Sequence, residues 1–241
     1  MAFRFVLLAL LASTHTLVAQ SPALAISRLT ADMYVFTTWQ LTGGSRFPAN
    51  GLYVLTDSGA VLLDTPWDPT QFQPLLDSIR VRHGQRVVLC LATHAHDDRT
   101  GGLAYYAQQG ISTYTSRMTD SISQVQGDPR ATRTFRQDTI FQVGQYSFDV
   151  YYGGPGHSPD NVVVWIPQTR LLYGGCLIKS TEATHLGNLA DANVSAWPAT
   201  LRHIRQRWGA PRYVIPGHQD WTDPHSPQHT LKLLRAAAKS R

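Results

Sequence analysis

The chain has 241 residues, of which 43% are hydrophobic, so it can bury one sizeable core. Its formal charge is +5 at pH 7, but the basic residues are scattered along the sequence, and this argues against a nucleic-acid partner. No linker, charge run or convincing repeat divides the chain, so we expect a single domain. No large exposed apolar repeat is evident either, and we expect a monomer.

The N-terminus has the pattern of a secretory signal peptide. Arg4 precedes an apolar run over residues 5–12, and small and polar residues follow up to Ala25. An ordinary buried first helix is the alternative, and the charge ahead of the run argues against it. We predict a signal peptide over residues 1–20, with the cleavage point left open up to Ala25, and one mature domain over residues 21–241. The apolar run is too short to span a bilayer, so we expect a periplasmic protein with no membrane anchor.

The first half predicts β-hairpins followed by a βα unit. Three segments rich in β-branched and aromatic residues are separated by turn formers. They cover residues 33–38, 51–56 and 60–64. Apolar residues then recur with helical spacing over residues 72–79, and Gly84 is placed to end that helix. Residues 86–92 predict a buried strand that follows it.

The second half repeats this order and completes the fold prediction. Its expected strands cover residues 140–143, 146–152, 162–166 and 170–173. A helix over residues 197–208, a strand over residues 213–215 and a last helix that carries Leu231 and Leu234 follow. We therefore predict an α/β fold in which two mixed sheets pack face to face with helices outside, a four-layer αββα sandwich. Such a sandwich places its loops and its chemistry along one edge.

Metal ligands follow several of these strands. The motif His94-x-His96-x-Asp98 comes directly after a buried strand, where a sharp turn would point two imidazoles and a carboxylate into one space. Three later segments each place one further ligand type at a strand end beside glycines, where the backbone can turn closely around an ion. These further candidates are His157, Cys176 and His218. The four segments together predict a metal site.

The chain has two cysteines, and an exported protein can form a disulfide between them. Their settings argue against that bond. Cys90 lies inside an apolar run, where it is most simply a small buried core residue, whereas Cys176 follows two glycines at a strand end. The setting of Cys176 favours a ligand.

This set of motifs resembles the metallo-β-lactamase superfamily and, within it, the metallo-β-lactamases whose second zinc is held by Asp, Cys and His. The resemblance extends from Asp64 to His218 and implies an enzyme with two Zn²⁺ ions per chain. It assigns His94, His96 and His157 to the first zinc, and Asp98, Cys176 and His218 to the second. Thioesterases of the glyoxalase II kind and other β-lactamase subclasses have a histidine ligand after the aspartate, whereas this chain has Arg99 there.

The resemblance also implies the reaction. It is hydrolysis of the β-lactam amide bond of penicillins, cephalosporins and carbapenems by a zinc-bound hydroxide, which gives antibiotic resistance. Asp98 or a water would relay the proton. Lys179 would bind the carboxylate of the small-molecule substrate, and Asn188 would act in binding and catalysis by supporting the carbonyl oxygen. The loop departs from the family here, because it has Asn-Leu-Ala-Asp where Asn-Leu-Gly-Asp is usual.

Other residues receive weaker expectations. Residues 39–50 look like the mobile flap of the family, with an ordinary long hairpin as the alternative. We expect Arg99 to orient Asp98, and Asp64 to act likewise. The histidines without a matching motif are expected at the surface, at helix ends or, for the last one named, in a loop: His83, His203, His225, His229 and His185.

Two other classes of function stay open. One is a hydrolase of the same fold that acts on a lactone or thioester, and the combination of Cys176 with Arg99 argues against it. The other is a non-catalytic periplasmic zinc-binding protein. Such a protein would lack an open coordination position, whereas this ligand set leaves one on each metal.

Overall fold

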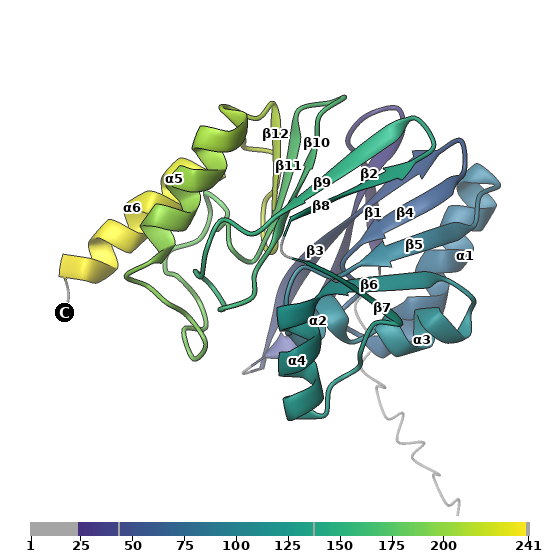
Figure 1. Ribbon diagram of the computed structural model, residues 1–241, viewed down its shortest axis with the longest axis horizontal. Coiled ribbons are helices and arrows are strands. Elements are labelled where there is room, and N and C mark those ends of the chain that lie inside the picture. Colours follow the sequence, from purple (N-terminus) through teal and green to yellow (C-terminus); the bar gives the residue numbers. More distant parts are fainter. Residues whose placement is uncertain (1–23, 43, 137, 240–241) are drawn as a thin grey trace, which may run out of the picture.

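Two β-sheets pack face to face in the computed structural model, and helices cover the outer face of each (Figure 1). The structure describes residues 24–42, 44–136 and 138–239, so the predicted signal peptide over residues 1–20 lies outside the described residues. The four layers are helices, sheet, sheet and helices. The predicted αββα sandwich is confirmed.

The first sheet contains seven strands in sequence order, β1-β2-β3-β4-β5-β6-β7. Neighbours from β1 to β4 are antiparallel, and those from β4 to β7 are parallel. The strands are β1 (Ala25–Arg28), β2 (Met33–Thr42), β3 (Ser45–Thr56), β4 (Gly59–Leu63), β5 (Val87–Leu91), β6 (Ser112–Ser116) and β7 (Arg133–Phe135).

The second sheet contains five strands in the order β12-β11-β10-β9-β8. Only the pair β11 and β12 is parallel, so this sheet is also mixed, as predicted. The strands are β8 (Thr139–Val143), β9 (Tyr146–Tyr151), β10 (Val163–Ile166), β11 (Leu171–Gly175) and β12 (Tyr213–Pro216).

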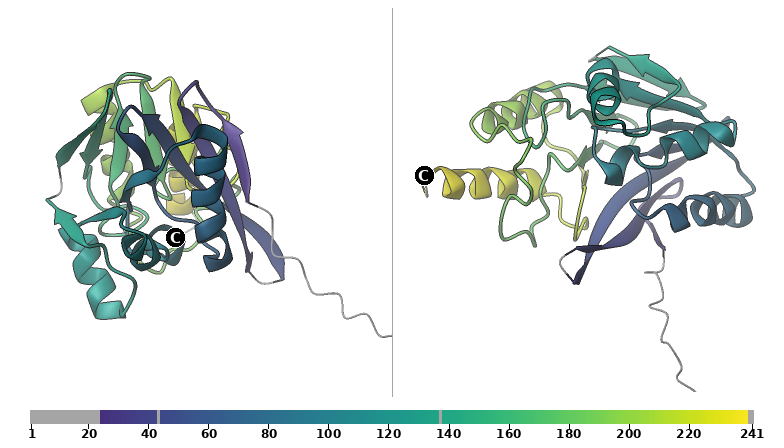
Figure 2. Two further views of the ribbon diagram at one scale, coloured as in Figure 1. Left: turned by 90° about the vertical axis from the view of Figure 1, so that its right-hand side faces the viewer. Right: turned by 90° about the horizontal axis from the view of Figure 1, so that it is seen from below.

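The helices lie outside the two sheets (Figure 2). They are η1 (Pro69–Gln71), α1 (Phe72–His83), α2 (Asp97–Thr100), α3 (Leu103–Gln108), α4 (Arg117–Gln126), α5 (Trp197–Trp208) and α6 (Ser226–Lys239). Helix α1 ends as the sequence predicted, because Gly84 adopts a φ of 66° and its N–H donates to the carbonyl of Arg80.

Three apolar clusters hold the four layers together. The largest lies between the sheets and includes Val35, Leu52 and Val164, all fully buried. A second cluster packs the outer face of the first sheet against α1 and α3, and a third packs the second sheet against α5 and α6. Strand β9 shows how one strand serves two faces, since its residues alternate between buried and partly exposed.

The structure adds elements that apolar patterning did not reveal. Strand β6 has the sequence Ser-Thr-Tyr-Thr-Ser, and its side-chain hydroxyls are buried or partly buried. The Thr113 hydroxyl accepts the backbone N–H of Thr132 at 2.8 Å, so polar residues take interior positions there. The hairpin of β2 and β3 also continues beyond the predicted strands, through most of the segment over residues 39–50.

The strand directions bring the predicted ligands to one edge of the sandwich. The chain leaves β5 just before His94, leaves β11 just before Cys176, and leaves β12 two residues before His218. Parallel strands end at the same edge of a sheet, and β11 is parallel to β12. Segments more than 100 residues apart in sequence therefore supply one site.

A pair of valine substitutions tests the inter-sheet core. Val164→Ala removes apolar volume from a fully buried position and should lower the free energy of unfolding by about 1.5–3 kcal/mol. Val81→Ala is the matched control, because this helical residue is 80% exposed and alanine is the better helix former. Urea unfolding of both variants measures the difference. Equal effects would contradict the assigned core.

Candidate metal centre

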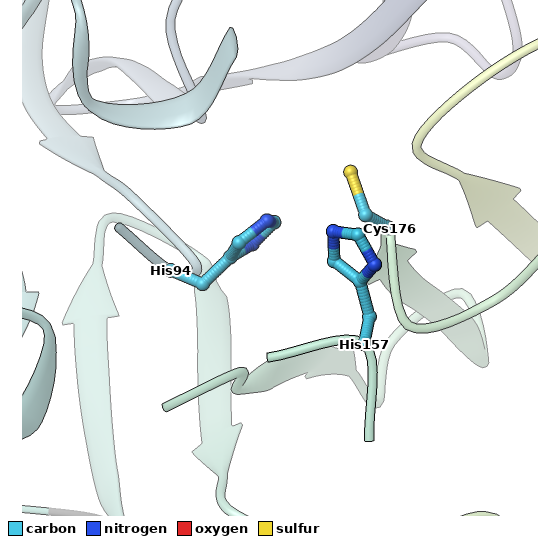
Figure 3. Close-up of side chains that lie close together, drawn as sticks. All are labelled: His94, His157 and Cys176. Carbon is cyan, nitrogen blue, oxygen red and sulfur yellow. The ribbon is translucent and has the colours of Figure 1, made fainter. Parts of the chain in front are cut away.

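Three histidine nitrogens converge at the edge of the sandwich. Nδ1 of His96 lies 3.1 Å from Nε2 of His94 and 3.2 Å from Nε2 of His157. Figure 3 shows the rings of His94 and His157 directed toward one space, with the sulfur of Cys176 beside it. The three residues that the resemblance assigned to a first metal therefore lie together.

A second group of donors lies next to the first. The Cys176 Sγ is 3.2 Å from Nε2 of His218 and 3.7 Å from Oδ2 of Asp98, and His218 Nε2 is 3.3 Å from the same carboxylate oxygen. The two groups are adjacent, since His94 also falls within 4.8 Å of a ligand atom of Cys176 or Asp98. All six predicted ligands meet in one place.

These separations suit zinc. A tetrahedral ion with Zn–N near 2.0 Å and Zn–S near 2.3 Å holds neighbouring ligand atoms roughly 3.3–3.6 Å apart. The closest separations within the two groups run from 3.1 to 3.7 Å. Imidazole, carboxylate and thiolate are also the donors that zinc prefers. The side chains fit one ion in each group.

His94, His157 and His218 lie in surroundings that favour the neutral ring, which is the form that binds a metal. Burial and the neighbouring histidines lower the pKa of His94 well below its usual value. Burial and the charge of Lys179 do the same for His157. Burial lowers the pKa of His218 to about 4, although the charge of Asp98 opposes this. Each of these rings therefore offers a nitrogen lone pair at neutral pH.

The pKa values of the two acidic ligand candidates, Asp98 and Cys176, shift in opposite directions. Burial raises the pKa of Asp98, but Arg99 and His218 outweigh that effect and lower it, so the carboxylate is ionised. Burial raises the pKa of the Cys176 thiol to about 12, against the opposing charges of Arg99 and Lys179. Without a bound cation this cysteine keeps its proton, and metal binding would release it.

Arg99 contacts the second group of donors through Asp98 and through the residue before His218. Its guanidinium is fully buried and donates to Asp98 Oδ2 at 2.7 Å, which confirms the predicted orienting contact. It also donates to the carbonyl of Gly217 at 2.9 Å and to that of Asn50 at 2.7 Å. A planar group with several donors can hold these acceptors together, and one of them precedes the ligand His218 in sequence.

Asp64 joins the same network from the end of β4. Its carboxylate accepts the backbone N–H of Thr93 at 2.7 Å and the hydroxyl of Tyr173 at 2.7 Å, and Arg99 lies 3.3 Å away. Burial raises its pKa to about 6, although Arg99 opposes the shift. The contact with Thr93 fixes the turn that carries His94, so Asp64 supports the first group directly and reaches Asp98 only through Arg99, whereas the sequence led us to expect that it orients Asp98.

The second ring nitrogens of two ligands are also held. Nε2 of His96 lies 3.0 Å from Oδ2 of Asp191, and Nδ1 of His218 lies 2.8 Å from the carbonyl oxygen of Pro48. Such contacts select the tautomer and the ring orientation of a metal-binding histidine. Pro48 belongs to β3, so the hairpin of β2 and β3 contacts His218 directly.

The donors open into a cavity of about 780 Å³. Phe47 and Trp67 form part of its apolar wall, and both rings contact the ring of His218. Lys179 and Asn188, the two predicted substrate residues, also line the cavity. Its volume is sufficient for a small molecule beside the metal ligands.

Lys179 and Asn188 lie in different settings. Lys179 is more than nine-tenths buried and its Nζ lies 5.4 Å from the ring centre of Trp197. No carboxylate pairs with this ammonium in the part of the chain that the structure describes. Asn188 is exposed, and its Oδ1 accepts the backbone N–H of Ala190 at 3.0 Å, as a turn residue does.

The structure also shows the state of the two cysteines and the position of His185. Both cysteines are free, and Cys90 is a buried core residue as expected. His185 lies in a loop, but it also lines the cavity, which its sequence position near Lys179 indicated only faintly. Sequence reasoning did not identify Asn50, Tyr173 or Asp191, since their partners are distant in sequence.

The comparisons with known proteins agree with this geometry. The model of the metallo-beta-lactamase superfamily matches residues 44–218. The chain is 42% identical to a protein named metallo-beta-lactamase type 2 from Elizabethkingia meningoseptica, over 89% of this chain and 86% of that one. It is 38% identical to metallo-beta-lactamase IND-1 from Chryseobacterium indologenes, over 84% and 85%.

The chain belongs to the metallo-β-lactamase superfamily. Two solved structures share its fold. A metallo-beta-lactamase from Pontibacter korlensis matches with a TM-score of 0.85 and 37% identity, over 88% of this chain and 99% of that one. Metallo-beta-lactamase IND-7 matches with a TM-score of 0.86 and 37% identity, over 90% of this chain and 100% of that one. These findings confirm the expected enzyme family and imply a metal cofactor, for which zinc suits the donors.

Conservative substitution of Arg99 tests the buried network. Arg99→Lys keeps the charge but loses the planar fork, so we expect the free energy of unfolding of metal-free protein to fall by roughly 3 kcal/mol. Arg130→Lys is the control, because Arg130 forms a comparable two-bond pair with Asp120 at an exposed position and should change stability little. Denaturant unfolding with a chelator present measures both. A small effect at Arg99 would refute the network's role.

Proposed function

We propose that this chain is a secreted zinc β-lactamase, which opens the β-lactam ring of penicillins, cephalosporins and carbapenems and so gives antibiotic resistance. The observation that carries the proposal is the arrangement of two adjacent donor groups that line a cavity together with Lys179, a lysine without a carboxylate partner among the described residues. The names of the relatives point to the same reaction.

Two zinc ions per chain fit the proposal. His94, His96 and His157 would hold one, and Asp98, Cys176 and His218 the other. When bound, a zinc pair lowers the pKa of water towards neutrality and stabilises developing negative charge. The ligands supply three neutral donors to one ion, and two anionic donors with one neutral donor to the other. The second ion would therefore carry the lower net charge.

Asp98 is the proposed proton relay. Arg99 fixes its carboxylate through Oδ2, so the group cannot rotate away from the cavity it lines. Held in this way, the carboxylate would take a proton from the attacking water and pass it to the lactam nitrogen as the ring opens. A water in the same place is the alternative relay.

Lys179 is the proposed anchor of the substrate carboxylate. Penicillins, cephalosporins and carbapenems all carry this group beside the lactam nitrogen. The ammonium lines the cavity without a carboxylate partner among the described residues, and its contact with Trp197 restricts its position. A buried cation without a counter-ion favours an anionic ligand.

Asn188 is proposed to support the lactam carbonyl. Its side-chain oxygen accepts the Ala190 N–H, which leaves the amide N–H groups of this cavity-lining residue to donate. The hairpin over residues 39–50 is proposed to act as a flap, with the partly exposed Phe47 available to cover bound substrate.

Export is part of the proposal. The sequence pattern over residues 1–20 supports a signal peptide, and residues 21–241 would then form the mature periplasmic domain and act as a monomer. Across the described part of the chain, no helix has both the length and the apolarity that a membrane crossing needs.

Metal removal tests the proposal. Hydrolysis of a penicillin, a cephalosporin and a carbapenem should stop when a chelator removes the metal and return with Zn²⁺. It should persist with acylating inhibitors of serine enzymes, because the proposed reaction uses no serine nucleophile. Full activity in metal-free protein would refute the mechanism. Turnover of lactones or thioesters with none of β-lactams would refute the substrate class.

Removal of the Lys179 charge tests the carboxylate anchor. A charge-assisted contact contributes roughly 1.5–3 kcal/mol, so Lys179→Ala should reduce kcat/KM by about 10- to 150-fold, mostly through KM. The zinc content should be unchanged, and Lys232→Ala on the exposed face of α6 is the matched control. Steady-state kinetics on a penicillin and on its neutral ester decide the role. Equal losses on both would show that Lys179 supports the site without binding the carboxylate.

A further inference from the structure

Two walls of the cavity carry opposite charges, and each wall comes from a different half of the chain. Lys179, the lysine of the cavity lining, comes from the loop that follows β11. Asp97 begins α2, and Asp128 follows the end of α4, so the other charged wall comes from the first half. Figure 1 shows α2 and α4 on one side and the loops before α5 on the other. The metal ligands lie between these walls.

Neither carboxylate of the first-half wall has an ion-pair partner among the residues that the structure describes. Asp97 is exposed between the ligands His96 and Asp98, and only its backbone carbonyl accepts a hydrogen bond. Asp128 uses its backbone N–H to bond the carbonyl of Ser123, while its carboxylate forms no ion pair with any described residue. Both residues line the cavity, so their negative charge lies at its wall without a counter-ion among the described residues.

Nearby arginines do not cancel this charge. Arg130 is bound to Asp120 through two hydrogen bonds of 2.8 and 2.7 Å. Arg46 lies 5.7 Å from the ring centre of Trp39 and is absent from the cavity lining, although its neighbours Ser45 and Phe47 contribute to it. The other two candidates, Arg117 and Arg136, line a separate cavity. The first-half wall keeps a net negative charge.

We propose that Asp97 and Asp128 select substrates by the charge of the acyl side chain. This inference rests on the proposed β-lactamase function. In a penicillin the carboxylate and the acyl side chain leave opposite ends of the fused rings. With the carboxylate at Lys179 and the lactam over the metal ligands, the side chain extends toward the first-half wall. A side chain with an ammonium group is then favoured, and one with a carboxylate is disfavoured.

Three penicillins that differ at one side-chain carbon provide the test. Aminobenzyl-, benzyl- and carboxybenzylpenicillin place an ammonium, a hydrogen and a carboxylate there. We expect kcat/KM of the zinc-loaded enzyme to fall in that order, with the ammonium substrate ahead of the carboxylate one by about fivefold or more at low salt. The ratio should shrink as ionic strength rises, because salt screens charges that reach solvent.

Two variants assign the effect to its residues. Asp128 is not next to any candidate ligand in sequence, and Asp128→Asn should reduce the ratio of kcat/KM for the ammonium substrate to that for the carboxylate substrate by about two- to fivefold. Asp97→Asn should act in the same direction, and its zinc content is measured because it adjoins two ligands. Asp77→Asn, a partly exposed aspartate on α1, is the matched control and should leave the ratio unchanged.

The outcomes separate the two proposals. Hydrolysis of all three penicillins at equal rates, or ratios that the Asp97 and Asp128 variants leave intact, would overturn the charge selection and leave the β-lactamase function standing. No hydrolysis of benzylpenicillin by zinc-loaded enzyme would instead overturn the proposed function. A ratio that changes equally in Asp77→Asn would also overturn the assignment to the cavity wall.

Discussion

The buried guanidinium of Arg99 is the interaction on which the site depends. It binds the Asp98 carboxylate at 2.7 Å and the carbonyls of Asn50 and Gly217, so it connects strand β3 with the segments that follow β5 and β12. A charge at this depth is tolerated only when its partners are close and well oriented. Asp98 is itself a candidate metal ligand, and Gly217 precedes His218. The contacts that stabilise the buried charge therefore also position these two side chains.

This organisation links the fold to the chemistry. The sandwich is held by its inter-sheet and outer cores, which leave the strand ends free to carry polar residues. Strand β3 then contacts the site at Pro48, whose carbonyl accepts from His218 at 2.8 Å, and at Phe47, whose ring packs against that of His218. The hairpin of β2 and β3 therefore helps to fix the orientation of His218.

Much of this was predictable from the sequence, because the ligands follow apolar strands at short, recognisable spacings. His94, Cys176 and His218 are each placed by the strand before them. Strand β6 was not predictable, since its interior positions are filled by threonine and serine hydroxyls instead of an apolar run. The hydrogen bond from the Tyr173 hydroxyl to the Asp64 carboxylate was not predictable either, because the two residues are 109 positions apart in the sequence.

X-ray absorption spectroscopy of the zinc-loaded protein tests whether Cys176 and the other five side chains hold two zinc ions. We expect one sulfur scatterer at about 2.3 Å for every two zinc ions, because Cys176 would bind only one of them, with the remaining ligands nitrogen or oxygen near 2.0 Å. Cys176→Ser should remove the sulfur signal and weaken one zinc far more than the other, while Cys90→Ser should leave the spectrum unchanged. A zinc-loaded, active protein without a sulfur ligand would contradict the account.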